Sequence, residues 1–308
     1  MSGAVHSALR LKQRRDWASF MDPSDRALAF WLLAPTAILL LLIIVYPVGR
    51  LVWTSLHNLS LTSGLPAEFV GLENFEIMLD DPIFWAALWN TVLITIITVP
   101  GALLVGLGLA LLANLPFRYR WPVRLALLVP WALPLSFVGL IFAWFFQSQY
   151  GVVNDILMRF GLPRIIWFNS PEWSFTAICL AIIWKTSSFV GLILLAGLQT
   201  IPRSLYEAAD VDGAGRLRQF FEITLPLLKP AIVVALIFRT ITALQTFDIP
   251  YTMTRGGPGT STATLAMYIH QNTVSFLDLG YGSALAVAMF VLSMGVTVIY
   301  LRMMGKGH

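Results

Sequence analysis

The sequence predicts an all-α membrane protein with six transmembrane helices and both termini in the cytoplasm. Of its 308 residues, 57% are hydrophobic and only 12% are charged, whereas soluble domains carry about 25% charged residues. The mean hydropathy is +0.76. The apolar residues also gather into six runs, each of roughly the 20 residues that a helix needs to cross a bilayer. Outer-membrane strands would instead alternate in polarity over segments of about 10 residues.

The six predicted spans follow one another with short polar connections. They are expected at residues 28–51, 84–113, 123–146, 173–198, 230–251 and 282–303. The chain would then consist of a leader (1–27), a six-span transmembrane domain (28–303) and a short tail (304–308).

The Lys and Arg residues predict how these spans are oriented. Cytoplasmic loops of membrane proteins carry an excess of both residue types. Fourteen of the twenty fall before the first span, in the connections after the second and fourth spans, or at the end of the sixth. We therefore expect the leader, the tail and a coupling loop at 200–229 in the cytoplasm. The predicted external loops are 57–83, 147–172 and 252–281.

The last external loop carries a strong helix-breaking signal. Gly and Pro in the sequence Arg255-Gly256-Gly257-Pro258-Gly259 should end the helix that precedes it. The following residues, 264–277, have mixed polarity, and we expect an external or re-entrant helix there rather than a seventh span.

The loop 200–229 is a charged island between two apolar runs. Ser204 and Glu207 have the spacing of a capping box, which predicts a helix over 205–211 with Ser204 as its N-cap. Gly213 and Gly215 allow a sharp turn with positive φ, and a second short helix is expected over 216–221, before Pro226. Such a knob could fill a cleft on a partner protein, or it could be an amphipathic segment on the membrane surface.

The amino-acid sequence of this loop resembles that of a known protein family. The sequences Glu207-Ala208-Ala209-Asp210-Val211-Asp212-Gly213-Ala214 and Ile223-Thr224-Leu225-Pro226-Leu227-Leu228-Lys229-Pro230 are similar to the EAA loop of permease subunits in ATP-binding-cassette importers. Phe247-Asp248-Ile249-Pro250-Tyr251, followed by Gly256-Gly257-Pro258, resembles the carbohydrate-uptake branch. The resemblance covers about 28–303, is most specific over 200–260, and is nearest to the maltose/trehalose type.

The resemblance implies a type I importer permease fold and a set of partners. An extracytoplasmic sugar-binding protein would deliver sugar to this chain and a second permease subunit, in the cytoplasmic membrane of a bacterium or archaeon. Two ATPase subunits, binding ATP and Mg²⁺, would drive transport. The residues implied in the contact with the ATPase are Glu207, Ala208, Ala209, Asp212 and Gly213.

ATP chemistry is expected on a partner chain. The sequence contains no phosphate-binding Gly-x-x-x-x-Gly-Lys-Ser/Thr loop, so we expect a transport subunit that is not an enzyme and binds no cofactor itself. The basic residues are scattered among short loops, so nucleic acid is not an expected partner, whereas membrane lipid is.

Three charged residues fall inside or near the predicted spans. Lys185 and Arg239 lie near the middle of the fourth and fifth spans, where a lone charge costs about 2.5–3.5 kcal/mol on insertion scales. Asp248 lies nine residues beyond Arg239, which on a continuous helix puts the two on opposite faces. Gln245, Asp248 and Tyr251 would share one face.

These residues could line a polar path for sugar, because amide and carboxylate groups bond hydroxyls and aromatic rings cover sugar faces. The candidates for this path are Lys185, Gln245, Asp248, Tyr251, Trp184 and Arg239. A structural alternative stays open: the two cations could bond backbone carbonyls or a partner's carboxylates, and Trp184 could belong to an interfacial belt.

The cargo is also open at this stage. A disaccharide or oligosaccharide of maltose/trehalose type is the first expectation, and a glycerol phosphate or a polyol is the alternative. An ion-coupled secondary transporter would usually show an internal repeat, and none is visible. A membrane-embedded enzyme would need a catalytic constellation, which the sequence does not display.

Overall fold

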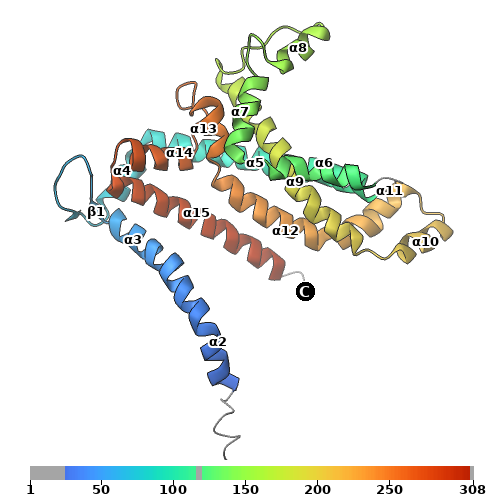
Figure 1. Cartoon of the computed structure of the whole chain (residues 1–308), viewed down its shortest axis with the longest axis horizontal. Coiled ribbons are helices and arrows are strands. Elements are labelled where there is room, and N and C mark those ends of the chain that lie inside the picture. Colours follow the sequence, from blue (N-terminus) through green and yellow to red (C-terminus); the bar gives the residue numbers. More distant parts are fainter. Residues whose placement is uncertain (1–24, 116–119, 306–308) are drawn as a thin grey trace, which may run out of the picture. The chain divides into compact units, whose positions relative to one another are not determined.

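A computed structural model describes residues 25–115 and 120–305 (Figure 1). The predicted leader lies almost wholly outside the described residues, as does the end of the predicted tail. The chain divides into two compact units, residues 1–53 and 54–308. The first unit contains helix α2 (Asp25–Leu40), a π-helical turn η1 (Leu41–Val45) and most of α3 (Tyr46–Ser55). These three elements form one apolar helix of span length, as predicted.

The second unit is almost entirely helical, with one small hairpin of strands β1 (His57–Asn58) and β2 (Glu68–Phe69). Its α-helices are α4 (Glu73–Asp80), α5 (Pro82–Asn114), α6 (Arg120–Ala132), α7 (Leu135–Phe145), α8 (Val152–Arg159), α9 (Pro171–Gln199), α10 (Arg203–Val211), α11 (Arg216–Gln219), α12 (Leu225–Leu244), α13 (Asp248–Thr254), α14 (Leu265–His270) and α15 (Leu279–Gly305). Two π-helical turns, η2 (Phe220–Thr224) and η3 (Gln271–Ser275), complete it.

Helix α9 is the centre of the second unit. Its most apolar window is 61% buried, against 28% for α5 and 22% for α15. Helices α5, α6 and α12 pack against it. The apolar side chains left exposed on the outer helices suit a hydrocarbon solvent. Among the described residues, five helices are long and apolar enough to cross a membrane, and a sixth span results if a bent pair counts as one. The all-α, multi-span prediction is confirmed.

The third span differs from the continuous helix predicted at 123–146. It is broken into α6 and α7, which meet at an angle of 98°. Leu133 and Pro134 form the break. Pro134 accounts for it, since a proline lacks the helical N–H donor and disfavours helical conformation in the residue before it.

The fifth span, predicted at 230–251, is displaced toward the N-terminus. One helix runs from Arg216 through η2 and α12 to Leu244, and Asp248 begins the separate short helix α13. The predicted short helix at 216–221 is therefore not a separate helix but the first part of this long one. Pro226 does not end it, because the chain widens into the π-helical turn just before the proline. Helix α13 does end before the glycine-rich segment, as predicted, with Arg255 in the left-handed conformation.

Close packing of α5 on α9 depends on a glycine. A Cβ atom at Gly106 would lie 2.8 Å from the Val190 Cγ1 atom and 2.9 Å from the Ser187 carbonyl oxygen. Gly108, two residues later on the same helix, has no such neighbour within 4 Å. The two glycines therefore form a matched pair for substitution.

We expect Gly106→Ala to destabilise the protein by about 1–3 kcal/mol, the usual cost of overpacking, because the carbonyl of α9 cannot rotate away as a side chain would. Gly108→Ala should be neutral or slightly stabilising, since alanine is more favourable than glycine in the interior of a helix. Thermal unfolding of the detergent-solubilised chain measures both. Equal unfolding temperatures for the two variants would contradict the close approach.

One carboxylate joins three elements at the end of the second unit that holds α4. Asp81 precedes α5 and accepts hydrogen bonds from the hydroxyls of Tyr268 on α14 (2.5 Å) and Tyr281 on α15 (2.6 Å). It also accepts one from the backbone amide of Ile83 (2.8 Å). Partial burial opposes its ionisation, but the hydrogen bonds prevail, so the pKa of Asp81 lies below its ordinary value of 3.8.

The lowered pKa of Asp81 predicts an acid-sensitive contribution to stability. A carboxyl whose pKa is lower in the folded state stabilises the protein fully above its unfolded pKa of about 3.9. That stabilisation is lost as pH falls through the folded-state value. Asp81→Asn should therefore lower the unfolding temperature at neutral pH, and the gap to wild type should narrow in acid. Exposed Asp80, changed to Asn, is the control and should shift neither value.

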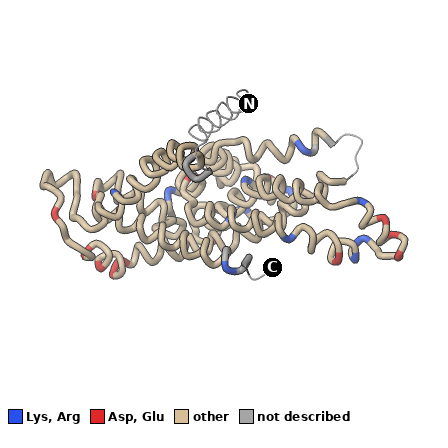
Figure 2. The backbone as a smooth tube through the Cα atoms, turned by 90° about the horizontal axis from the view of Figure 1, so that it is seen from below, with Lys and Arg blue, Asp and Glu red and all other residues tan. Residues whose placement is uncertain are grey.

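The acidic residues lie mainly at the ends of the second unit. Figure 2 shows most Asp and Glu positions gathered at two ends, with largely uncharged helices between them. Helices α10 and α11 lie at one of these ends, and α4 with β1 lies at the other (Figure 1). A cleft at the first end and a cavity among the intervening helices hold most of the candidate residues.

Candidate functional site

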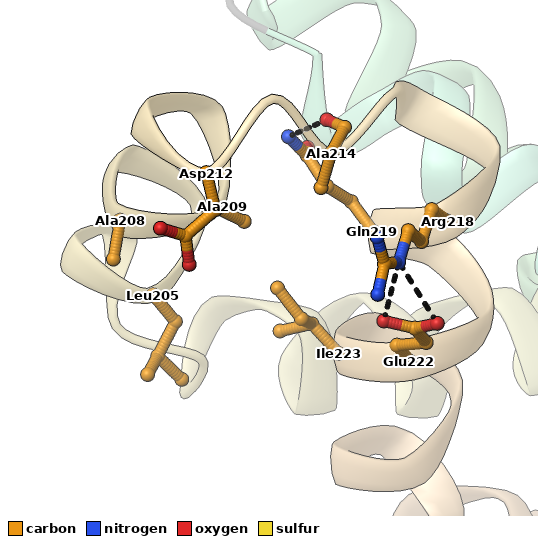
Figure 3. A pocket seen from close by; sticks show the side chains of 9 residues that line it. All are labelled: Leu205, Ala208, Ala209, Asp212, Ala214, Arg218, Gln219, Glu222 and Ile223. Atoms are coloured by element: carbon orange, nitrogen blue, oxygen red, sulfur yellow. Dashed lines mark hydrogen bonds and ion pairs between the residues drawn. The ribbon is translucent and has the colours of Figure 1, made fainter.

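The predicted coupling loop folds as a helical knob with a cleft (Figure 3). The cleft, of about 260 Å³, lies between α10 and the start of the helix of the fifth span (Arg216–Leu244). Ala208, Ala209 and Asp212 line it, whereas Glu207 is exposed beside it. The residues that line the cleft are Leu205, Ala208, Ala209, Asp212, Ala214, Arg218, Gln219, Glu222 and Ile223. Its floor is apolar and its rim is charged, with an ion pair between Arg218 and Glu222 at 2.9 Å.

Gly213 makes the turn after α10. It adopts φ +72°, and its amide donates to the Asp210 carbonyl at 3.1 Å, while the Ala214 amide donates to the Ala209 carbonyl at 2.9 Å. These two bonds form a Schellman motif, the C-terminal cap that favours glycine in the left-handed position. The positive φ predicted for Gly213 is confirmed. Gly215, in contrast, has φ −65°, so that part of the prediction is wrong.

The predicted start of this helix is also wrong. Helix α10 begins at Arg203, after Pro202, and no side chain caps it. Ser204 lies inside the first turn rather than at the N-cap, and the capping box with Glu207 does not form. Pro202 explains the shift, since its fixed φ favours it at the edge of a helix.

A second candidate region is a cavity of about 100 Å³ between α7, α9, α12 and the break that follows α12. Arg239, Gln245 and Asp248 line it together. The helix ends at Leu244, so the face assignment made for a continuous helix is wrong. Arg239 and Asp248, expected on opposite faces, border one space. Small-molecule sites usually measure about 300–1,000 Å³, so the described residues enclose only part of a sugar-sized site.

Arg239 is held by hydroxyl groups. Its Nη2 donates to Thr98 Oγ1 on α5 at 2.8 Å, and its Nη1 donates to Thr242 Oγ1 at 3.3 Å. The side chain is only 4% exposed, and its Nε atom has no hydrogen-bond partner among the described residues. A buried guanidinium with neutral partners and a spare donor has capacity for an anion.

Asp248 links two short helices. It accepts a hydrogen bond of 2.7 Å from Ser136 Oγ on α7. The same pair of helices makes a close contact at Gly139, where an added Cβ atom would meet the Thr252 side chain. Helices α7 and α13 therefore pack as a pair beyond the breaks in the third and fifth spans.

Lys185 lies elsewhere. Its ammonium group donates to the backbone carbonyls of Pro130 (2.7 Å) and Trp131 (2.6 Å) at the end of α6. Neighbouring Ser188 donates to the carbonyl of Leu127 on the same helix. A cation at a helix C-terminus stabilises the carbonyls left without helical donors. This is the structural arrangement that the sequence left open for Lys185.

The two aromatic candidates are also separated. Tyr251 stacks on Phe247, with ring centroids 4.9 Å apart, and His270 lies 5.1 Å from Phe247. Trp184 instead contacts Phe142 at 5.3 Å and lines a different cavity, beside Pro130. The sequence thus placed Trp184 with the other candidates, but the structure does not bring it to the Arg239 cavity.

The sequence did not predict the hydroxyl partners of the candidates. Thr98 on α5 and Thr242 on α12 accept hydrogen bonds from Arg239, and Ser136 on α7 donates to Asp248. Phe247 lines the same cavity. Hydroxyl residues in an apolar span were the available signal, but their pairing depends on tertiary packing.

Comparison with known proteins places the chain in a family. Residues 102–304 match the family of binding-protein-dependent transport system inner membrane components. The sulfoquinovosyl glycerol transport system permease protein SmoG of Agrobacterium fabrum is 77% identical over 291 residues, which are 94% of each chain. The trehalose/maltose transport system permease protein MalF of Thermococcus litoralis is 39% identical, over 90% of this chain and 94% of that protein.

A solved structure shares the fold. The bacterial ABC transporter involved in the import of the acidic polysaccharide alginate contains a chain with a TM-score of 0.78 and 24% identity. The match covers 97% of this chain and 99% of that one. This chain is therefore a multi-pass membrane permease subunit of an ATP-binding-cassette importer, and it belongs to the family of binding-protein-dependent transport system inner membrane components.

Proposed function

We propose that this permease imports an anionic glycoside of the sulfoquinovosyl glycerol type. The observation that carries the proposal is the 77% identity, over nearly the whole of both chains, with a permease named for that compound. Arg239 supports it, because it offers a buried cation with a spare donor beside the cavity of the fifth span. The first expectation from sequence, a disaccharide or oligosaccharide of maltose/trehalose type, becomes the second candidate, favoured by the more distant relative MalF.

The rest of the site would come from a second permease subunit. The cavity lined by Arg239 is about 100 Å³, too small for a glycoside, which supports a facing chain that completes the path. We infer that Arg239, Gln245, Asp248 and Tyr251 border this chain's share of the path. Lys185 and Trp184 would act only through the shape of α6 and α9.

Transport would be powered at the coupling loop. Two separate ATPase subunits, binding ATP and Mg²⁺, would dock against α10 from the cytoplasm. Exposed Glu207 would meet a basic or polar group of the ATPase, and the cleft lined by Ala208, Ala209 and Asp212 would accept an ATPase side chain. Gly213 would fix the turn that presents this surface. An extracytoplasmic binding protein would deliver the cargo to the opposite side.

A reconstituted complex tests the cargo. The complex of both permeases and both ATPases is placed in proteoliposomes with its binding protein, and ATP hydrolysis and uptake are followed. Sulfoquinovosyl glycerol should stimulate both, whereas glucosyl glycerol, the matched neutral compound, should stimulate little. Trehalose, maltose and glycerol 3-phosphate complete the panel. Stimulation by a neutral disaccharide but not by the sulfonated glycoside would overturn the proposal.

A further inference from the structure

Two sets of side-chain hydrogen bonds connect α10 and the turn after it with the helix of the fifth span (Arg216–Leu244). In the first set, the Tyr206 hydroxyl lies 2.9 Å from the Thr224 hydroxyl. In the second, Gln219 Nε2 donates to the Asp210 carboxylate at 2.6 Å and to the Ala214 carbonyl at 3.0 Å. Figure 3 shows the Gln219 side chain reaching toward Ala214 across the turn. The helix and the span beyond it are thus joined at two points.

The Tyr206 bond is made in an apolar setting. The Tyr206 ring packs against the cluster that contains Leu198, Ile201 and Leu228, and Thr224 is only 6% exposed. The Thr224 hydroxyl also lies 3.4 Å from the Gln219 carbonyl, so it can accept from Tyr206 and donate to that carbonyl. A buried hydroxyl deprived of its partner is costly, and this favours retention of the bond during motion.

The Thr224 hydroxyl also bridges the π-helical turn in the helix of the fifth span. The π-helical turn η2 runs from Phe220 to Thr224, and such turns interrupt the regular helical ladder. The contact from Thr224 back to the Gln219 carbonyl crosses that turn. Tyr206 therefore joins α10 to the helix of the fifth span at its π-helical turn.

The helix of the fifth span connects the contact between Tyr206 and Thr224 with the cavity lined by Arg239. Including its π-helical turn, it runs as one helix over the 29 residues from Arg216 to Leu244, a length of about 43 Å at 1.5 Å per residue. Arg239 lies in its last turns, and Gln245 follows its end. A displacement of α10 reaches the cavity as a rigid-body movement only if α10 cannot pivot on its flanking loops.

We propose that Tyr206 and Gln219 are positioning residues that lock α10 onto the helix of the fifth span (Arg216–Leu244). Movement of the ATPase at α10 is then transmitted to the translocation path. The proposal rests on the coupling function proposed for the loop. It assigns a role that is separate from contact with the ATPase, since Tyr206 packs against the core of the permease, and Gln219, although it lines the cleft, bonds Asp210 and Ala214 of its own chain. Without these hydrogen bonds the docking surface still forms, but α10 can move relative to the helix of the fifth span.

The test uses the complete importer in proteoliposomes and measures glycoside uptake, ATP hydrolysis and ATPase retention by the tagged permease. Tyr206→Phe and Thr224→Val each remove one hydroxyl, and Gln219→Leu removes the second tie. Each should lower uptake per ATP hydrolysed by about two- to tenfold, the range expected from one net hydrogen bond. ATPase retention should stay at the wild-type level.

Two comparisons separate a lock from a folding defect. Thr224→Ser keeps the hydroxyl and should restore the uptake per ATP that Thr224→Val loses, and the double variant Tyr206→Phe/Thr224→Val should be no worse than either single one. Thr200→Val removes a hydroxyl that bonds only within its own helix end and should leave uptake per ATP unchanged.

Three outcomes would overturn the lock. They are wild-type uptake per ATP in the Tyr206, Thr224 and Gln219 variants, a loss of ATPase retention in proportion to uptake, or a failure of Thr224→Ser to restore coupling. Failure of the underlying function has a different signature, because the wild-type complex itself would then neither retain an ATPase nor take up any glycoside.

Discussion

Gly213→Val is expected to lower uptake by the assembled importer about five- to thirtyfold. Gly213 holds φ +72° in the cap of α10, and a side chain with a Cβ atom in that conformation costs roughly 1–2 kcal/mol. A cost of that size changes the population of the turn by about five- to thirtyfold. The cleft walls of α10 and η2 would then separate, while the spans themselves stay folded.

The neighbouring glycine gives a matched control for this prediction. Gly215 has φ −65° and, like Gly213, would place a Cβ atom in open space. Gly215→Val should therefore leave uptake close to wild type. Gly213→Asn should lie between the two, because asparagine tolerates the left-handed region better than valine does. The measurement is uptake in proteoliposomes beside ATP hydrolysis. Wild-type uptake by Gly213→Val would contradict the role of the turn.

Much of the architecture could be predicted because membrane helices are marked by length and polarity alone. Helix α9 was expected at 173–198 and is found at Pro171–Gln199. Helix α5 agrees equally well with its predicted span. In both cases a polar or proline-containing start adjoins a long apolar run, so hydropathy locates the ends.

The two broken spans could not be read from hydropathy. Pro134 lies within an apolar run, and a window average does not register the missing N–H donor that breaks the third span. In the fifth span, helical periodicity was extended through Gln245 to Asp248, although the chain leaves the helix at Leu244. That step assigned Arg239 and Asp248 to opposite faces. Helix-face arguments hold only while the helix continues.

The candidate site was predicted unevenly for a related reason. The coupling loop is local in sequence, so its residues alone predicted a short helix that carries Ala208 and Ala209 and a turn at Gly213, as found. The intramembrane candidates depend on which helices meet. Lys185 donates hydrogen bonds to carbonyls of α6, whereas Arg239 donates to hydroxyls of α5 and of its own helix. Two buried cations with the same sequence signature thus have different surroundings.

Arg239→Leu is expected to lower uptake of the sulfonated glycoside about ten- to hundredfold. A hydrogen bond to a charged group contributes about 1.5–3 kcal/mol, which corresponds to that range if the spare donor of Arg239 bonds the anion during passage. Its present partners, Thr98 and Thr242, are neutral hydroxyls, so they leave the positive charge uncompensated. No carboxylate among the described residues forms a salt bridge with it.

The matched substitution separates charge from shape at this position. Arg239→Lys keeps the positive charge at this position, so it should retain part of the uptake of the sulfonated glycoside. If Arg239 only braced α12 against α5, the Lys and Leu variants would lose uptake of sulfonated and neutral glycosides alike. If it serves the anion, Arg239→Leu should transport glucosyl glycerol no worse than wild type does. Selectivity between these two compounds, measured in the same proteoliposomes, therefore tests Arg239 more sharply than the absolute rate, because a packing defect in α12 would affect both cargoes.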